Sequence, residues 1–347
     1  MIKAGIIGAT GYAGATLVYL LNNHTEVEIV YLASHSYAGQ SFSSLYPGMR
    51  NSVDIILDEI DINKASNICD VVFLALPAGH ASSLVSQSIL DNTVIIDLGA
   101  DFRLDNAEVY KQWYKQEAAP ANILKQAVYS LADIKPFNAG ATNLIANPGC
   151  YTTCSILTLA PLLINSLIDS TSIVINAMSG VSGAGRKANI STMFCEVNGS
   201  IKAYGVSTHR HTPEIEMALS KLSHKDVIVQ FTPHLVPMNR GILSNCTAKL
   251  KKGVTKEMVA KAYNDLYNDS TFVNLLDYGT FPETRFTLGT NRIDIGYVLD
   301  SRTNNIVTIG AIDNLVKGAA GQAVQNMNLK FNLDPTLGLT NCCANPY

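Results

Sequence analysis

The chain has 347 residues, of which 47% are hydrophobic and only 15% charged, so it is long enough for two domains with buried cores and is not disordered. Its net charge of −3, without a run of Lys and Arg, excludes the basic surface that nucleic-acid binding needs. No apolar stretch reaches the ~18 residues of a membrane span. The seven cysteines are scattered and form no CxxC pair, so they predict neither a disulfide framework nor a metal site. We therefore expect a cytoplasmic protein that binds no metal, no nucleic acid and no membrane.

Short strands and helical stretches alternate in the first third of the chain. Four runs rich in Val, Ile and Leu, with little alternation, are typical of buried parallel strands. These runs are 3–8, 28–33, 71–76 and 93–97. Helices are expected at 13–21, from the spacing of its apolar residues, and at 105–116, where Asp105 can cap the first turn and Glu108 follows. This repetition predicts an α/β fold with an open parallel sheet covered by helices on both faces.

The pattern changes near position 148. A long apolar helix is expected at 151–164, and further helices at 255–267 and 314–328. The strands of this part alternate polar and apolar residues, which indicates a largely antiparallel sheet with one exposed face. They are expected at 172–178, 227–235, 242–250, 292–299 and 305–312. We therefore expect a second, α+β domain to begin near 148.

A glycine-rich loop, Gly8–Gly14 (GATGYAG), lies between the first strand and the first helix. Glycines there let the backbone turn tightly and approach a pyrophosphate, while the helix N-terminus supplies N–H groups and partial positive charge. This context predicts dinucleotide binding, and the alternative is a tight turn that binds nothing. After the second strand, Ser34, His35 and Ser36 stand where an NAD-preferring domain carries Asp or Glu, so we expect NADP(H) rather than NAD.

Cys150 is the candidate nucleophile. Pro148 and Gly149 end the preceding strand, so Cys150 falls at the start of the apolar helix, where the positive helix end favours a thiolate. Cys154, one turn later, is expected to be a small core residue. A nicotinamide domain combined with an activated thiol indicates thioester chemistry, in which hydride reduces a cysteine-bound acyl group to an aldehyde, or the reverse.

The segment Thr-His-Arg-His-Thr-Pro-Glu holds two candidate acid/base groups, His209 and His211. An imidazole titrates near neutrality, as acid/base catalysis requires. Both histidines are expected to precede a helix opened by Pro213, and in an extended segment they would point the same way. We assign His209 as the acid/base and His211 to substrate binding. The candidate anion clamps are Arg103, Arg186 and Arg240.

Ten ordered motifs resemble those of the N-acetyl-gamma-glutamyl-phosphate reductases, a family of arginine biosynthesis. The resemblance covers nearly the whole chain. Its motifs are GATGYAG (8–14), SHSYAG (34–39), LALPAGH (74–80), DLGADFRL (97–104), AEVYKQWY (107–114), NPGCY (147–151), SGVSGAGRKA (179–188), HRHTPEIE (209–216), PHLVPMNRGI (233–242) and IDNLVKGAAGQAVQNMN (312–328).

The resemblance implies NADPH-dependent reduction of N-acetyl-L-glutamyl 5-phosphate to its semialdehyde and phosphate, with Cys150 as nucleophile and His209 as acid/base. It implies substrate contacts for Arg103, Arg186, His211, Glu214 and Arg240. It implies cofactor contacts for Gly8, Thr10, Gly11, Tyr12, Ala13, Gly14, Ser34, Ser36, Pro77, Ser182, Gly183 and Asn314.

The family's plan also implies a domain division and a homo-oligomer. Residues 1–148 plus 311–347 would form the NADP-binding Rossmann domain, and 149–310 the catalytic and dimerisation domain with a largely antiparallel mixed sheet, as in semialdehyde dehydrogenases. A dimer or tetramer is implied. The chain departs from the family at Thr152, usually Pro, at His35, often Arg, and at Gly99, commonly Ser. None of these changes removes a catalytic group.

Two other functions stay open on the sequence. The first is reduction of a homologous acyl phosphate, such as aminoadipyl phosphate in lysine biosynthesis, because a pocket discriminates one methylene by only ~1–3 kcal/mol. The second is a non-catalytic regulator that binds NADP(H) and senses redox state through Cys150.

Overall fold

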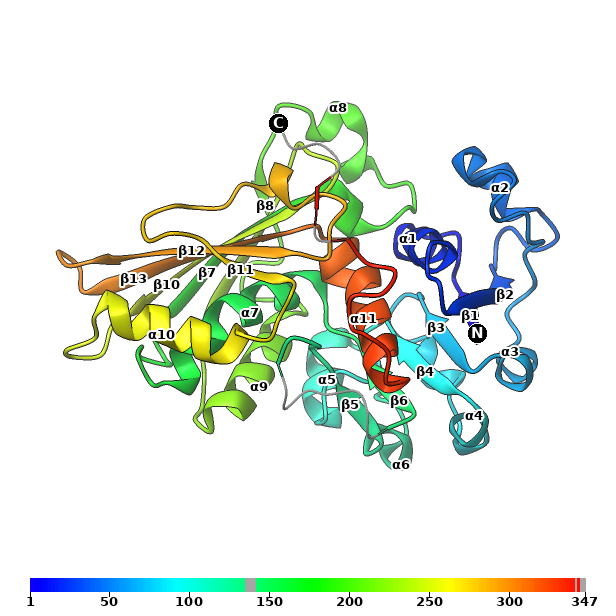
Figure 1. Cartoon of the computed structure of the whole chain (residues 1–347), viewed down its shortest axis with the longest axis horizontal. Helices are drawn as coiled ribbons and strands as arrows, with labels where there is room; N and C mark the ends of the chain where they lie inside the picture. The colour runs from blue at the N-terminus through cyan, green and yellow to red at the C-terminus, as the bar shows by residue number, and fades with distance from the viewer. Residues whose placement is uncertain (135–141, 341, 344–347) are drawn as a thin grey trace. The chain divides into compact units, whose positions relative to one another are not determined.

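The computed structural model describes residues 1–134, 142–340, 342 and 343, which form two compact units (Figure 1). The first unit comprises 1–132, 142–149 and Ala319–Leu339, and the second comprises 133–134, Cys150–Gly318, 340, 342 and 343. The unit boundary after Gly149 lies one residue from the expected position. No helix among these residues is long and apolar enough to cross a membrane.

The chain returns to the first unit later than the expected position 311, and its tail does not stay there. Residues 311 and 312 still belong to a strand of the second sheet, β13 (Asn305–Ile312), so the return comes only at Ala319. Thr340 lies with the second unit, where its carbonyl accepts a hydrogen bond from the Asn291 N–H at 2.9 Å. The rest of the expected tail, at 341 and 344–347, lies outside the described residues.

The first unit is built on a six-stranded parallel sheet in the order β2-β1-β3-β4-β6-β5. Its strands are β1 (Ile2–Ile7), β2 (Val27–Ala33), β3 (Val71–Leu74), β4 (Val94–Asp97), β5 (Ala127–Tyr129) and β6 (Leu144–Ala146). Its helices are α1 (Tyr12–Asn22), α2 (Phe42–Leu45), α3 (Ile62–Ile68), α4 (Gln87–Asn92), α5 (Ala107–Tyr114), α6 (Ala121–Leu124) and α11 (Gly321–Lys330). The four expected strands are confirmed.

One helix start differs from the expectation. The expected cap of α5 was Asp105, but the side chain that caps it belongs to Asn106. The Asn106 Oδ1 accepts the N–H groups of Glu108 and Val109 at 3.0 and 3.2 Å. Both Asn and Asp are favourable caps, so the sequence did not separate these neighbours.

The second unit is built on a seven-stranded mixed sheet in the order β11-β12-β13-β10-β7-β9-β8. Its further strands are β7 (Ile173–Gly180), β8 (Lys202–Ala203), β9 (Val229–Val236), β10 (Ile242–Lys249), β11 (Val273–Leu275) and β12 (Ile293–Asp300). Only the β7–β9 and β11–β12 pairings are parallel, which confirms a largely antiparallel sheet. Three helices lie on one side of this sheet in Figure 1: α7 (Cys150–Ile164), α9 (Thr212–Ser223) and α10 (Lys256–Tyr267).

The expected helix at 314–328 is interrupted. A π-helical turn, Val316–Ala320, follows β13, and a regular helix begins only at Gly321. The apolar spacing is helical throughout, so the sequence pattern does not distinguish the wider turn from an α-helix.

Helix α7 is buried along nearly its whole length although it contains a proline. Pro161 has no N–H, so the Leu157 carbonyl one turn earlier loses its helical partner. The Tyr267 hydroxyl donates to that carbonyl at 2.6 Å, and the Tyr263 hydroxyl donates to the neighbouring Thr158 carbonyl at 2.6 Å. Tyr267 therefore replaces the donor that Pro161 lacks, and both tyrosines of α10 fix the helix that begins with Cys150.

Candidate active site

The glycine loop has the backbone that dinucleotide binding requires. Gly8 has a φ of +85°, and a Cβ there would lie 2.4 Å from the Ala75 carbonyl oxygen. A Cβ on Gly14 would lie 2.2 Å from the Gly8 carbonyl oxygen. Gly11 is the N-cap of α1 and provides no side-chain cap. Because no side chain occupies the helix start, its N–H groups and partial positive charge suit a pyrophosphate.

The end of β2 lies beside this loop, as the expected cofactor site requires. The hydroxyls of Thr10 and Ser34 are hydrogen-bonded at 2.8 Å, and both residues are buried. The Tyr46 hydroxyl, which the sequence did not single out, donates to the Thr10 carbonyl at 2.8 Å. Ser36 and His35 are exposed next to them. The structure thus brings together the predicted cofactor residues that follow β1 and those that follow β2.

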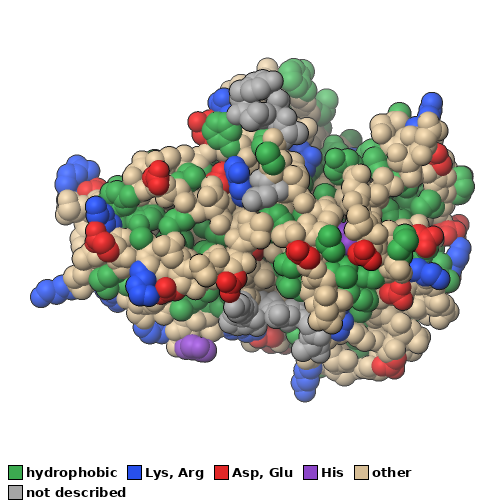
Figure 2. All heavy atoms as spheres, viewed as in Figure 1, with side chains coloured by type: hydrophobic (Ala, Val, Ile, Leu, Met, Phe, Trp, Pro, Cys, Tyr) green, Lys and Arg blue, Asp and Glu red, His purple; other side chains and the backbone are tan. Residues whose placement is uncertain are grey.

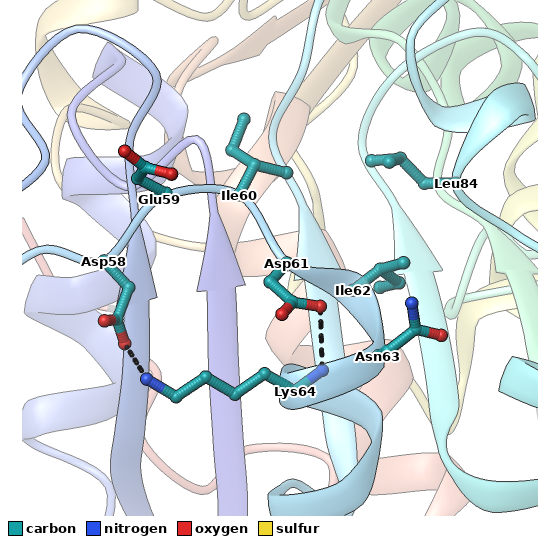
Figure 3. A pocket seen from close by; sticks show the side chains of 8 residues that line it. All are labelled: Asp58, Glu59, Ile60, Asp61, Ile62, Asn63, Lys64 and Leu84. Carbon is teal, nitrogen blue, oxygen red and sulfur yellow. Dashed lines mark hydrogen bonds and ion pairs between the residues drawn. The ribbon is translucent and has the colours of Figure 1, made fainter.

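An acidic segment that the sequence analysis missed also reaches the end of β2. The Ser34 N–H donates to the Asp58 carbonyl at 3.0 Å, and Asp58 pairs in parallel with Ala33. The Asp58 carboxylate forms an ion pair with Lys64 at 2.9 Å. Figure 3 shows both side chains in an open hollow lined by Asp58, Glu59, Ile60, Asp61, Ile62, Asn63, Lys64 and Leu84. The strand end therefore carries a carboxylate supplied by another segment and neutralised by a lysine.

Asp101 holds the loop that follows β3, where Pro77 was assigned to the cofactor. Its carboxylate accepts the N–H of Gly79 at 2.6 Å and of Ser82 at 2.9 Å. The Tyr110 hydroxyl donates to it at 3.0 Å. Pro77 itself is exposed. Asp101 therefore shapes this loop, a role that the motif at 97–104 did not by itself reveal.

Asp97, the last residue of β4, is fully buried beside Asp101. Its Oδ1 accepts the Gly99 N–H at 2.9 Å, whereas its Oδ2 has no hydrogen-bond partner in the described part of the chain. Burial, and then the charge of Asp101, raise the pKa of Asp97 to about 7. This carboxyl group can therefore change its protonation state near neutrality.

Arg103 is buried and binds backbone carbonyls. Its Nε donates to the Asn147 carbonyl and its Nη2 to the Leu98 carbonyl, each at 2.8 Å. These bonds hold the chain just before Gly149 in the first unit. The geometry gives Arg103 a structural role there, and its contact with substrate stays a prediction.

Cys150 is the first residue of α7, as expected, and is partly exposed. Cys154 is completely buried one turn later, and burial raises the pKa of its thiol well above the usual range. A buried, protonated thiol is inert. Position and exposure therefore favour Cys150 over Cys154 as the reactive thiol.

The two candidate histidines lie together, but in a turn rather than in an extended segment. The Thr212 N–H donates to the His209 carbonyl at 3.0 Å, and α9 begins at Thr212 with His211 as its cap residue. The two imidazole rings are 4.9 Å apart. The expectation that both precede the helix is confirmed, and of the two conformations considered for the segment, the structure has a turn and not an extended chain.

His209 lies among aromatic rings and does not titrate near neutrality as expected. Its ring is 5.7 Å from that of Tyr151, 5.4 Å from Tyr204 and 5.3 Å from Phe231. Burial, and then the charge of Arg210, lower the pKa of His209 to about 4. The His211 N–H donates to His209 Nδ1 at 3.1 Å. The neutral ring therefore carries its proton on Nε2 and is a hydrogen-bond donor there.

Two hydrogen-bonded tyrosines pack against the ring of His209, and one of them, Tyr151, directly follows Cys150 in the chain. The Tyr204 hydroxyl donates to the Tyr151 hydroxyl at 3.2 Å, and the latter donates to the His234 carbonyl at 3.1 Å. Burial raises the pKa of Tyr204 to about 12, and a negative charge on Cys150 contributes to this rise. Cys150, the tyrosines and His209 thus form one cluster, and both tyrosines stay protonated near neutrality.

The remaining predicted residues of the second unit differ in their surroundings. Glu214 is completely buried in the first turn of α9. Arg240 forms an ion pair with buried Asp313 at 2.9 Å. Arg186 is exposed. The Asn314 amide donates to the Ser182 hydroxyl at 3.0 Å, and a Cβ on Gly183 would lie 3.8 Å from that amide nitrogen, so these three predicted cofactor residues lie together.

Comparisons with known proteins support both units separately. Residues 3–140 match the family described as "Semialdehyde dehydrogenase, NAD binding domain". Residues 150–314 match "Semialdehyde dehydrogenase, dimerisation domain". The fold is also that of aspartate semialdehyde dehydrogenase II from Vibrio cholerae, with a TM-score of 0.71 at 19% identity, covering 96% of this chain and 99% of that one. A structure of aspartate semialdehyde dehydrogenase with NADP from Candida albicans has a TM-score of 0.67 at 17% identity. The match covers 96% of this chain and 99% of that one.

Much closer relatives carry one name. The chain is 52% identical to an N-acetyl-gamma-glutamyl-phosphate reductase of Lachnospira eligens, over 98% of both proteins. It is 48% identical to that of Lachnoclostridium phytofermentans, also over 98% of both. It is 46% identical to that of Campylobacter jejuni subsp. doylei, over 97% of this chain and 98% of the relative. The chain therefore belongs to the N-acetyl-gamma-glutamyl-phosphate reductase family, with a dinucleotide-binding unit and a dimerisation unit of the semialdehyde dehydrogenase type.

Proposed function

We propose that this protein reduces N-acetyl-L-glutamyl 5-phosphate to N-acetyl-L-glutamate 5-semialdehyde and phosphate, with NADPH as reductant and a thioester on Cys150 as intermediate. The observation that carries the proposal is the cluster around Cys150, where a partly exposed thiol at a helix start lies with two protonated tyrosines and a neutral His209. The names of relatives at 46–52% identity support the choice of substrate.

The cofactor fits the first unit. Gly8 and Gly14 leave space for the backbone to approach a pyrophosphate, and the uncapped start of α1 offers N–H groups. Thr10 and Ser34 would lie beside the ribose, with Ser36 following. NADPH would supply hydride to the acyl carbon. The NADP-bound C. albicans relative supports this cofactor.

The reaction begins with the thiolate of Cys150, which the N-terminus of α7 stabilises. Its Sγ attacks the acyl carbon, the carbon–oxygen bond to phosphate breaks, and phosphate leaves with the bonding electrons. After the thioester is reduced, the tetrahedral alkoxide re-forms a carbonyl and the C–S bond breaks. The products are the aldehyde and the regenerated thiolate, and the proton consumed overall is carried by phosphate at neutral pH.

In these reaction steps, His209 is best suited to donate a hydrogen bond to the developing oxyanion. Its Nδ1 accepts the His211 N–H, so Nε2–H is the group left to bond the oxygen of the acyl carbon. A pKa of about 4 means that the ring is not protonated at neutral pH. Arg240, oriented by Asp313, and exposed Arg186 are the candidates to bind the anionic groups of the substrate.

The protein also self-associates through its second unit in this proposal. The name of the matching dimerisation family supports this, together with five exposed apolar side chains between 190 and 206. They are Ile190, Met193, Phe194, Ile201 and Val206. Figure 2 shows hydrophobic atoms on the surface over α8 (Phe194–Val197) at the top of the view. We name these five side chains the apolar patch.

The experiment that tests the function follows the reverse reaction, because the aldehyde is more stable than an acyl phosphate. Purified protein, N-acetylglutamate semialdehyde, NADP⁺ and phosphate are mixed and absorbance of NADPH is recorded. We expect phosphate-dependent NADPH formation, faster with NADP⁺ than with NAD⁺ and faster than with the aminoadipate homologue. His35→Asp should shift the preference towards NAD⁺ by placing a negative charge near the 2′-phosphate. An absence of turnover in the intact protein, or a preference for the longer substrate, would overturn the proposal.

A further inference from the structure

The chain leaves β13 through a wide turn that ends against the nucleophile. The Gly318 N–H donates to the Asp313 carbonyl at 3.0 Å, a five-residue step that belongs to the π-helical turn Val316–Ala320. Such turns are rare because their hydrogen-bond geometry is unfavourable, and they are frequent at functional sites. The neighbours of this turn therefore indicate what keeps it in place.

Gly318 packs directly on Cys150. A Cβ on Gly318 would lie 2.8 Å from the Cβ of Cys150 and 3.1 Å from its Cα. It would also lie 3.3 Å from Cδ1 of Ile312. Cβ atoms essentially never approach other atoms within 3.0 Å, and Cys150 starts a buried helix that cannot easily move. Only glycine fits, and its backbone supports the Cα–Cβ bond that carries the reactive sulfur.

Asp313 holds the start of this turn. Its Oδ1 accepts the N–H groups of Leu315 at 2.8 Å and Val316 at 3.2 Å. Its Oδ2 accepts the Gly289 N–H at 2.8 Å and pairs with Arg240 at 2.9 Å. Asp313 is completely buried. One carboxylate thus fixes both the turn and the guanidinium group that we assign to substrate binding.

A buried ion pair holds the end of the turn. Lys317, next to Gly318, contacts the carboxylate of Asp133, and the two side chains are 0% and 1% exposed. The Ser270 hydroxyl donates to Asp133 at 2.6 Å, and the lysine nitrogen lies 5.5 Å from the centre of the Phe272 ring. Burying two charges contributes little net stability, because the loss of hydration offsets their attraction. The pair ties the residue beside Gly318 to Asp133.

We propose that Gly318 is a positioning residue for Cys150, held in place by Asp313 and by the Lys317–Asp133 pair. The proposal rests on the proposed function, in which Cys150 is the nucleophile. It assigns the close glycine contact to catalysis: the backbone at 318 sets the direction of the thiol, and a displacement of about 1 Å is enough to lower the rate of attack on the order of 100-fold.

The main test is Gly318→Ala, with Gly48→Ala as the matched control because a Cβ on Gly48 would meet no atom within 4 Å. We expect Gly318→Ala to lower kcat 10-fold or more, with the KM for NADP⁺ within 2-fold of wild type. Gly48→Ala should leave both constants unchanged. A folded Gly318→Ala protein with kcat within 2-fold of wild type would overturn the proposal.

The reactivity of the thiol gives a readout that does not depend on turnover. Alkylation of Cys150 by iodoacetamide is followed by mass spectrometry over a range of pH, with exposed Cys195 in the same sample as internal reference. We expect Gly318→Ala to change the rate or pH midpoint for Cys150 and to leave Cys195 unchanged. An unchanged Cys150 profile would count against positioning. If wild type lacks the proposed activity, this comparison still tests the contact with Gly318, so the two failures are distinguishable.

A second variant covers the case in which Gly318→Ala does not fold. Lys317→Met combined with Asp133→Leu removes both charges and keeps apolar volume, so the fold should survive better than with either single change. We expect this double variant to lower kcat and alter Cys150 alkylation while the protein stays folded. If the double variant keeps the kcat and the Cys150 alkylation of the wild type, the ion pair does not position Cys150.

Discussion

The hydroxyl of Thr152 donates a hydrogen bond of 2.8 Å to the carboxylate of Glu214, and both residues are completely buried. Thr152 lies two residues after Cys150 in α7, and Glu214 lies in the first turn of α9, three residues after His211. This bond therefore fixes the helix that begins with Cys150 against the helix that follows the two histidines.

Thr152→Val tests this bond. Valine has the shape of threonine without its hydroxyl, so Glu214 would lose one donor inside the core, and we expect a loss of ~1–3 kcal/mol in the free energy of unfolding. Thr152→Ser keeps the hydroxyl and should lose clearly less. Urea unfolding of the three proteins measures the difference. Equal losses in the two variants would mean that packing of the methyl group, and not the hydrogen bond, is important at this position.

A pH-dependent stability is expected from Asp97. Its pKa is raised to about 7 in the folded protein, mainly by burial. Between the unfolded value near 4 and this folded value, the folded state binds more protons than the unfolded state, so stability falls as pH rises through this window. Asp97→Asn keeps the acceptor for Gly99 and removes the charge. We expect it to stabilise the protein by about 4 kcal/mol at pH 8 and by much less at pH 4.5.

Thermal unfolding of wild type and Asp97→Asn at several pH values checks this account. Asp54→Asn is a suitable control, because this carboxylate lies outside the buried pair. A constant difference between wild type and Asp97→Asn from pH 4.5 to pH 8 would contradict the raised pKa.

The role of His209 predicts an unusual pH profile. Because its pKa is lowered to about 4, chiefly by burial, we expect no limb near neutrality from this group and a fall in kcat only as the pH approaches 4. His209→Asn can still donate a hydrogen bond and should lose less activity than His209→Ala, for which we expect a loss on the order of 100-fold. His211→Asn should mainly raise KM for the acyl substrate. A limb near pH 6.5 that disappears in His209→Asn would show that the ring acts instead as an ordinary acid/base.

Self-association should depend on the apolar patch. Phe194 is 75% exposed in the isolated chain, so Phe194→Asp should not disturb a monomer, but it would bury a charge in an interface. We expect the variant to dissociate at least 10-fold more readily in light scattering after gel filtration. Tyr19→Asp, at an exposed position of the first unit, is the control. An unchanged assembly in Phe194→Asp would place the interface elsewhere.

Much of the fold follows from local patterns in the sequence. A continuous apolar run indicates a strand buried on both faces, and this pattern predicts β1. An alternation of polar and apolar residues indicates a strand buried on one face, and this pattern predicts β13. Short elements without such a period were missed, among them β5, β6 and α6, which have three or four residues each. Their formation depends on neighbouring strands that the sequence does not place.

In the candidate site, too, some residues could be predicted from local patterns and others could not. Cys150 and the glycine loop have local signals, since a helix start and a strand–turn–helix can be recognised from neighbouring residues. Asp313 and the Lys317–Asp133 pair have none, because their ionic partners lie far along the chain: Arg240 is 73 residues from Asp313, and 184 residues separate Lys317 from Asp133. Asp58 has none either, because its place beside Ala33 depends on a β-bridge and not on neighbouring residues. The lowered pKa of His209 was also unpredictable, because it arises from burial among Tyr151, Tyr204 and Phe231.

In the proposed mechanism, Cys150 carries the acyl group. The most direct measurement mixes the protein with N-acetylglutamate semialdehyde and NADP⁺ without phosphate, so that the reverse reaction stops at the thioester. We predict a burst of NADPH equal to the concentration of active sites, and an N-acetylglutamyl adduct on the peptide that contains Cys150, with neither in Cys150→Ala. A burst in Cys150→Ala, or an adduct on Cys154 in the wild type, would contradict the account.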